Sequence, residues 1–289
     1  MKKIVAFLMA CFLFPNQADS EDVVKPIPMP IVKDDEFAYI KSSAPDEKRG
    51  PEYRKWLAAS IQIRVTGAAG SGTIIYYDGK EWAYVQSCGH LWENGQMTAE
   101  EGKRRNLKCK IIAWYHNEKK LDGPKTYEAE VLYFYHYRGR DCSLLRFKPD
   151  WSPNYFPIAP KNFVPIEGKK YNSCGCDGAR EVAHYDVKFV GVRGQDYITT
   201  DNSPRPGRSG GGLMTEDHYI GICWGTSDVN GSGIGYFTPL FVLRELNEKE
   251  GFGWLNDIGV SSLAQQIPIL DRNGKQGKYP QDYIPIPKN

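Results

Sequence analysis

Three short segments of the sequence place a histidine, an aspartate and a serine where they could act together. His90 follows an apolar run that ends at Gln86, Asp141 begins another apolar run, and Ser209 lies in Gly207-Arg-Ser-Gly-Gly-Gly-Leu213. A serine hydroxyl is a weak nucleophile unless an imidazole takes its proton, and that imidazole needs a carboxylate to fix its tautomer. The N–H groups of Gly207 and Ser209 could hold the oxyanion formed during attack on a carbonyl. These residues therefore indicate acyl-transfer chemistry.

The glycines around Ser209 also satisfy the Gly-x-Ser-x-Gly turn of α/β-hydrolases. That fold requires the chain order serine, acid, histidine, and the only histidine after Ser209 is His218. The short stretch between them leaves no room for an intervening strand and helix. The subtilisin order would need Asp78, which lies in a hairpin signal, as the acid. The order histidine, aspartate, serine is the one that fits this chain.

Short strands must position these residues. Apolar or alternating runs between turn signals predict a first set of strands at 61–65, 72–77, 82–86, 110–115, 127–135 and 143–147. A second set is predicted at 170–174, 182–192, 196–200, 212–214, 219–224 and 234–237. The first predicted helix covers 239–249, with Thr238 as its cap and Pro239 at its first position. This order predicts an all-β protein of two antiparallel barrels followed by a helix.

Several segments resemble the trypsin-like (chymotrypsin-fold) serine peptidases, and they occur in that family's chain order. They are Gly70-Ser-Gly-Thr73, Cys88-Gly-His90, Asp141-Cys-Ser-Leu-Leu145, Gly207-Arg-Ser-Gly-Gly211, Tyr219-Ile-Gly-Ile-Cys-Trp-Gly225 and Gly233-Ile-Gly-Tyr-Phe-Thr238. The resemblance covers roughly residues 60 to 246 and is to bacterial-type members. It implies two six-stranded antiparallel Greek-key barrels with a C-terminal helix, and a triad of His90, Asp141 and Ser209.

The resemblance also implies an activity, that of an exported serine endopeptidase acting on polypeptides through an acyl-enzyme, with no metal or organic cofactor. The alternative is a catalytically weak or inactive module of the same fold that binds a peptide as an added strand.

By the same resemblance, Ser203 forms the base of the specificity pocket, Gly225 and Gly235 its walls, and Cys223 and Trp224 belong to the substrate-aligning strand. A neutral base and glycine walls predict a preference for uncharged, bulky residues on the acyl side of the cut. Arg205 and Arg208 keep an acidic preference as the alternative, although both are also expected as ordinary solvated loop charges.

Three residues depart from the family pattern. Arg208 stands where digestive-type members carry an aspartate that pairs with a newly cut N-terminus, and arginine cannot accept that partner. Gly89 replaces an alanine before the histidine, and Cys223 replaces a serine that often supports the aspartate. We therefore expect activity without N-terminal activation, and both weaker catalysis and a pseudoenzyme stay open.

The N-terminal region predicts export. Residues 1–20 combine two lysines, an apolar stretch and a small-residue cleavage site, as in a signal peptide, which predicts a secreted or periplasmic protein. A lipoprotein box ending at Cys11 would instead anchor the chain to a membrane by a lipid. Residues 21–56 form a Pro-rich leader or linker, 57–250 the peptidase domain with barrels at about 57–150 and 151–250, and 251–289 an irregular extension.

Composition narrows the partners and leaves the cysteine pairing open. The 37 basic and 35 acidic side chains give a net charge of +2, which offers no reason to expect a nucleic-acid partner. Six cysteines remain after Cys11, and an exported chain could pair them in three disulfides of undetermined connectivity. They are Cys88, Cys109, Cys142, Cys174, Cys176 and Cys223.

Overall fold

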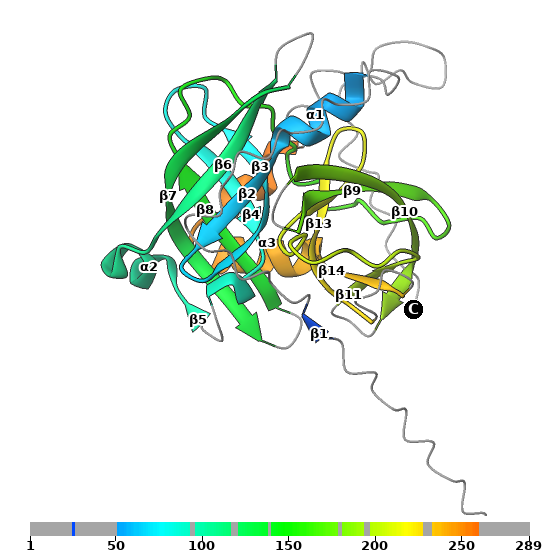
Figure 1. Ribbon diagram of the computed structural model, residues 1–289. Helices are drawn as coiled ribbons and strands as arrows, with labels where there is room; N and C mark the ends of the chain where they lie inside the picture. The colour runs from blue at the N-terminus through cyan, green and yellow to red at the C-terminus, as the bar shows by residue number, and fades with distance from the viewer. Residues whose placement is uncertain are drawn as a thin grey trace, which may run out of the picture.

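The computed structural model describes residues 25–26, 51–92, 96–116, 121–137, 140–178, 181–193, 197–227 and 233–259. The expected signal peptide, most of the expected leader and the extension beyond residue 259 lie outside the described residues. Two β-barrels lie side by side, and short helices flank them (Figure 1). Among the described helices, none is both long and apolar enough to cross a membrane.

The first barrel is a closed antiparallel sheet of six strands. Their spatial order is β7, β6, β2, β3, β4 and β8, and a pairing of β7 with β8 closes the ring. The short strand β5 adds to β7 at its C-terminal end. The strands are β2 (Ser60–Val65), β3 (Ala68–Tyr77), β4 (Ala83–Ser87), β5 (Gln96–Met97), β6 (Lys108–His116), β7 (Leu121–Tyr137) and β8 (Arg140–Phe147).

The second barrel repeats this closure. Its spatial order is β13, β12, β9, β10, β11 and β14, with β13 pairing β14 to close the ring, while β1 (Lys25–Pro26) adds to β13. The strands are β9 (Lys170–Asp177), β10 (Glu181–Arg193), β11 (Tyr197–Thr200), β12 (Gly212–Met214), β13 (Tyr219–Thr226) and β14 (Gly235–Pro239). The sequence prediction of two six-stranded antiparallel barrels is therefore confirmed.

The predicted hairpin at Asp78 joins β3 to β4. Asp78 Oδ1 accepts hydrogen bonds from the backbone N–H groups of Lys80, Glu81 and Trp82 at 2.7 to 3.0 Å. Gly79 takes a φ of +74°, a conformation in which a side chain would be strained. The residues Asp78 and Gly79, from which the hairpin was predicted, therefore form the turn between β3 and β4.

One continuous cluster of buried apolar side chains runs through both barrels. It includes Ile61 and Leu144 from the first barrel and Ile222 and Phe237 from the second. Every residue of β13 is buried, so this strand lies between other parts of the protein on both faces. Removing each such side chain from water contributes about 1.5–3 kcal/mol, so the two barrels stabilise one another.

Two helices were not expected from the sequence. Helix α1 (Pro51–Ala59) leads directly into β2, and its Trp56 stacks on His184 of β10 with ring centroids 4.9 Å apart. Helix α2 (Ala99–Arg105) begins with a capping box in which the Thr98 side chain and Glu101 bond each other's backbone N–H groups. The first helix thereby ties the start of one barrel to the other.

The helix predicted near the C-terminus is present as α3 (Leu240–Lys249), but its start differs. Pro239 is the N-cap residue and makes no side-chain cap. The expected cap, Thr238, instead donates its hydroxyl to the backbone oxygen of Asp141 at 3.0 Å. The Thr238 hydroxyl therefore joins β14 to β8 of the other barrel instead of capping the helix that follows it. The short helices η1 (His90–Trp92) and η2 (Gly253–Asn256) complete the described elements.

The cysteines do not form the disulfides that the sequence allowed. All six of the described cysteines are free thiols and all are buried. Cys174 and Cys176 belong to the same strand, while the others lie on or beside strands of the barrel interiors. Buried free thiols of this kind pack much as small apolar side chains do, although Cys88 and Cys142 also have polar neighbours.

Candidate active site

Strand pairing brings Asp141 to the residues just before His90. Strand β4 ends at Ser87, which pairs with Ser143 of β8, so the antiparallel register leads from that pair towards Gly89 and Asp141. A Cβ at Gly89 would lie 1.8 Å from the backbone oxygen of Tyr135. The departure from alanine at this position therefore has a steric reason in this chain.

Asp141 holds the histidine through both carboxylate oxygens. Its Oδ2 lies 2.5 Å from His90 Nδ1, and its Oδ1 accepts the backbone N–H groups of Gly89 and His90 at 2.6 and 2.8 Å. The aspartate is 1% exposed and the histidine 6%. A carboxylate on Nδ1 fixes the tautomer and leaves Nε2 to exchange protons.

This environment changes the protonation of His90. Burial alone would lower the pKa of the imidazole, but the adjacent Asp141 carboxylate and the Cys88 thiol raise it well above the ordinary 6.5. The charged imidazolium is therefore stabilised by its carboxylate partner, as a proton acceptor next to a nucleophile requires.

The sequence did not single out Cys88 as a site residue. Its Sγ lies 3.7 Å from His90 Nε2 and within 4.8 Å of a carboxylate oxygen of Asp141. Burial raises the pKa of the Cys88 thiol above its ordinary value, so it stays protonated and is a poor nucleophile. Its spacing of two residues from His90 at the end of a strand is the signal that could have found it.

Cys88, His90 and Asp141 also form a set of possible metal ligands, with ligand atoms within 4.8 Å of one another. Asp141 already bonds His90 Nδ1, which leaves a thiol and one imidazole nitrogen. Catalytic zinc sites use three protein ligands, so this set fits a zinc ion poorly.

The turn that carries Ser209 is held from both barrels. Its carbonyl accepts a hydrogen bond from the N–H of Ser71 in β3 at 2.7 Å, and the Ser71 hydroxyl donates to the carbonyl of Gly207 at 2.8 Å. On the other side, Gly210 donates to the carbonyl of Cys223 at 2.9 Å. Gly-Ser-Gly at 70–72 therefore positions the serine turn as well as forming a strand.

Gly210 is required by the close approach of these elements. Its φ is +85°, and a Cβ there would lie 2.1 Å from the carbonyl oxygen of Ser71 and 2.2 Å from Ser87 Oγ. Only glycine allows the serine turn to contact the first barrel so closely.

Ser209 itself is fully buried. Within the described part of the chain its Oγ has no hydrogen-bond partner, so the serine–histidine hydrogen bond is not formed in this conformation. The structure thus brings His90 and Asp141 into contact. It places Ser209 on a turn whose backbone is hydrogen-bonded to Ser71 of β3.

Arg208 is a fully buried side chain and not the solvated loop charge that was expected. Its Nε donates to Asp177 Oδ1 at 2.8 Å, its Nη1 donates to the backbone oxygen of Ser173 at 2.7 Å, and its guanidinium lies 4.2 Å from the ring centre of Tyr185. Since Gly207 and Ser209 flank Arg208, this anchoring fixes the backbone of the serine turn.

The residues expected to form the specificity pocket lie together. Ser203 Oγ is 2.6 Å from Thr226 Oγ1, and Thr226 pairs with Gly235 across β13 and β14. Gly225 and Trp224 precede Thr226 in β13, and Cys223 bonds the serine turn through its backbone. A Cβ at Gly235 would meet the carbonyl of Asn202 at 2.6 Å, so this glycine provides close packing there.

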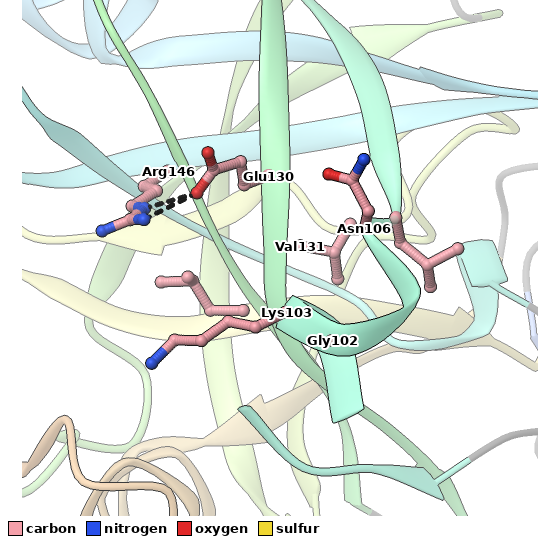
Figure 2. A pocket seen from close by; sticks show the side chains of 8 residues that line it. Gly102, Lys103, Asn106, Glu130, Val131 and Arg146 are labelled. Atoms are coloured by element: carbon pink, nitrogen blue, oxygen red, sulfur yellow. Dashed lines mark hydrogen bonds and ion pairs between the residues drawn. The ribbon is translucent and has the colours of Figure 1, made fainter. Parts of the chain in front are cut away.

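A pocket elsewhere on the first barrel lacks these residues. It has a volume of about 230 Å³ and lies between α2 and β7, where Arg146 forms an ion pair with Glu130 (Figure 2). Its remaining lining is Gly102, Lys103, Asn106, Leu107, Val131 and Leu132. None of His90, Asp141 and Ser209 belongs to this lining, and its carboxylate, Glu130, is paired with Arg146.

Two closed six-stranded antiparallel barrels, few helices and the chain order of these segments define a trypsin-like serine protease fold. Three similar solved structures are described as proteases or a mutant of one. The Rv3671c protease, inactive form, has a TM-score of 0.51 and 16% identity, covering 78% of this chain and 100% of that chain. A serine-to-alanine mutant of Rv3671c from M. tuberculosis H37Rv, also an inactive form, has a TM-score of 0.52 at 16% identity, covering 78% and 97%.

The serine endoprotease from Yersinia pestis has a TM-score of 0.51 and 20% identity, covering 72% of this chain and 66% of that chain. At these identities the similarity establishes the fold. No protein-family model matches the sequence, and no curated protein matches it.

Proposed function

We propose that this protein is a serine endopeptidase that cleaves polypeptides through an acyl-enzyme. The observation that carries the proposal is the 2.5 Å hydrogen bond between His90 Nδ1 and Asp141 Oδ2, in a fold shared with solved proteases. This bond supports a catalytic role because it leaves Nε2 of a tautomerically fixed imidazole to accept a proton.

In the proposed reaction, Ser209 Oγ attacks the scissile carbonyl while His90 Nε2 takes the hydroxyl proton. The same proton passes to the leaving amine, and water then hydrolyses the ester by the reverse use of His90. The N–H groups of Gly207 and Ser209 are the proposed oxyanion donors. Neither of them donates a hydrogen bond to another described residue, which leaves both free for a substrate oxygen.

The second candidate function is a peptide-binding module without hydrolytic activity. The unpartnered, buried Ser209 Oγ favours it, because the hydroxyl is not activated in this conformation. The enzyme proposal requires that Oγ approach His90 Nε2 when a peptide binds, as hydrogen bonds in unliganded active sites often tighten only in the complex.

Labelling with a fluorophosphonate, followed by peptide mass spectrometry, tests the enzyme proposal. We expect modification of Ser209 in the folded protein, and no labelling of Ser209→Ala or His90→Ala. Ser152→Ala and His218→Ala are matched controls, since these residues lie outside the proposed site, and both should label normally. A folded protein that stays unlabelled while a known serine peptidase reacts would favour the binding module.

The site of action is a further proposal from the sequence. A basic start, an apolar stretch and small residues before position 21 support export to the periplasm or medium. Lipid attachment at Cys11 is the alternative. Mass spectrometry of the N-terminus of protein recovered from the producing cell would distinguish cleavage after residue 20 from a lipidated Cys11.

A further inference from the structure

The strand that runs past the serine turn, β13, has two different edges. One edge is covered by β14, which pairs with it from Gly221 to Thr226. The other edge is covered in three successive steps. Strand β12 pairs up to Ile222, the serine turn bonds Cys223 through Gly210 and Gly211, and β1 pairs with Gly225 and Thr226. Strand β1 therefore continues the same edge on which Ser209 is mounted.

The direction of β1 points towards the serine turn. The pairing is antiparallel, with Lys25 opposite Thr226 and Pro26 opposite Gly225, so β1 runs against β13 in the direction of Cys223. Two strand residues correspond to about 7 Å, which is the separation between the Gly225 and Cys223 levels of β13. Figure 1 shows β1 in dark blue, remote in sequence from the barrel strands that it joins.

The site is closed to solvent in the same conformation. Ser209 is 0% exposed and His90 is 6% exposed. An extended peptide that approached Ser209 along this edge of β13 would need the backbone groups of Gly225 and Thr226, which β1 already pairs. One edge position cannot pair two strands at once.

The sequence around β1 suits an occupant that binds without forming a long ladder. Pro26 has no N–H, and prolines recur at positions 28 and 30. A proline cannot donate to a neighbouring strand and is tolerated only at sheet edges. Pro26 therefore cannot donate a backbone hydrogen bond to β13, which favours displacement of β1 by a strand that can.

We propose that the leader segment around Lys25 and Pro26 docks as an added strand on the edge of β13 opposite β14 and keeps extended peptides from Ser209. The proposal rests on the proposed function for the regulatory consequence, while the docking itself is independent of catalysis. The leader is then a built-in competitor for the substrate edge, and it is displaced or removed before the protein acts.

The test compares full-length mature chains, beginning at Glu21, that differ only in the leader. In one variant, residues 23–28 are replaced by Gly and Ser at equal length. In the matched control, residues 41–46 are replaced in the same way. Each protein is treated with an extended peptidyl phosphonate, whose backbone has to pair with β13, and with a small fluorophosphonate, which does not.

We expect the 23–28 replacement to accelerate labelling by the peptidyl phosphonate at least tenfold, with no acceleration in the 41–46 control. The ratio of the two probes corrects for any general change in Ser209 reactivity. Equal ratios in all three proteins would overturn the proposal.

Binding of the leader in trans separates this proposal from the enzyme proposal. A synthetic peptide of residues 21–30 is titrated by calorimetry into the 23–28 replacement carrying Ser209→Ala, with a scrambled peptide of the same composition as control. We expect saturable binding of the leader peptide only. If no protein reacts with either probe, the enzyme proposal fails while this titration still decides the docking, and an absence of binding overturns it.

Discussion

The buried guanidinium of Arg208 pairs with the partly buried carboxylate of Asp177, and this ion pair anchors the serine turn to β9 of the second barrel. Both Nε and Nη2 of the guanidinium lie 2.8 Å from Asp177 Oδ1, and the other carboxylate oxygen accepts the hydroxyl of Tyr185 at 2.5 Å. A buried guanidinium is tolerated only when it is paired and hydrogen-bonded. The pair therefore couples the conformation of the turn to the end of β9.

Breaking this pair should cost stability and reactivity together. Asp177→Asn leaves the arginine buried without its counter-charge, a change that costs about 3–5 kcal/mol in comparable cases. We expect a lower free energy of unfolding in urea and slower fluorophosphonate labelling of the remaining folded protein. Asp150→Asn is the control, because Asp150 pairs with the exposed Lys125. Equal effects of the two substitutions would contradict an anchoring role for Arg208.

Asp141 should be needed for rate more than for binding. Asp141→Asn keeps an acceptor for the backbone N–H groups of Gly89 and His90 but supplies no carboxylate to His90 Nδ1. By analogy with the triad of the trypsin-like serine peptidases, we expect kcat to fall by about 10⁴-fold with little change in KM. Steady-state hydrolysis of a peptide selected from a library measures both constants. A fall of only a few fold would remove Asp141 from the proposed triad.

The pH dependence follows from the raised pKa of His90. Burial lowers this pKa, but the Asp141 carboxylate outweighs burial and raises it well above 6.5. The proton acceptor has to be neutral, so kcat/KM should be lost as the pH falls through the raised value, on the alkaline side of an ordinary histidine. In Asp141→Asn this acidic loss of kcat/KM should occur at lower pH. A loss of kcat/KM that occurs only below pH 6 in the unmodified protein would contradict the assignment.

The contribution of His90 to the free energy of unfolding should fall as the pH rises, whereas kcat/KM should rise. Because the folded-state pKa of His90 is raised, the contribution of the protonated pair is complete below the unfolded-state pKa and is lost as pH rises through the folded-state pKa. The difference in unfolding free energy between the unmodified protein and His90→Ala should therefore shrink from acidic to alkaline pH. Urea unfolding across that range measures it.

The barrels could be predicted from the sequence because their signals are local. Strand β12 occupies 212–214 as expected, and the Asp78 turn has the residues that its geometry requires. Helix α2 was missed although Thr98 and Glu101 carry its capping box, a signal that strand-rich surroundings obscured. Helix α1 lacked such a signal, and its position depends on the contact of Trp56 with His184.

The site was less accessible to sequence reasoning because its contacts join distant segments. The order of His90, Asp141 and Ser209 indicated the chemistry, yet nothing local showed that Thr238 would bond Asp141 instead of capping a helix. The burial of Arg208 depends on its ion pair with Asp177, which lies at the end of β9, remote in sequence. The roles of the catalytic and pocket residues stay predictions, and the experiments on Ser209 and Asp141 address them.

The thiols provide a test of the cysteine state. With all six described cysteines buried and free, the folded protein should not react with a bulky thiol reagent, whereas all six should be alkylated after denaturation without reductant. Mass spectrometry counts the alkyl groups on each cysteine. Each disulfide formed during export would lower that count by two and would identify the pairs that the sequence left open.

Specificity should depend on the hydroxyl pair at the expected pocket base. Ser203 is 5% exposed and lies 2.6 Å from Thr226 Oγ1, so the base is neutral and already hydrogen-bonded. It offers no carboxylate to a lysine or arginine, and we expect cleavage after uncharged, bulky residues. Replacing the neutral hydroxyl by a carboxylate, Ser203→Asp, should shift preference towards basic residues, whereas Ser203→Ala should leave the uncharged preference in place.

A peptide library read by mass spectrometry gives the cleavage profile of each protein, with Ser152→Ala as a serine substitution on the surface that should not alter it. Arg208 is already paired with Asp177 and is therefore unsuited to bind an acidic side chain, which leaves Arg205 as the candidate for an acidic preference. Predominant cleavage after Lys or Arg in the unmodified protein would refute Ser203 as the pocket base. Cleavage after Asp or Glu that is lost in Arg205→Ala would assign specificity to Arg205 instead.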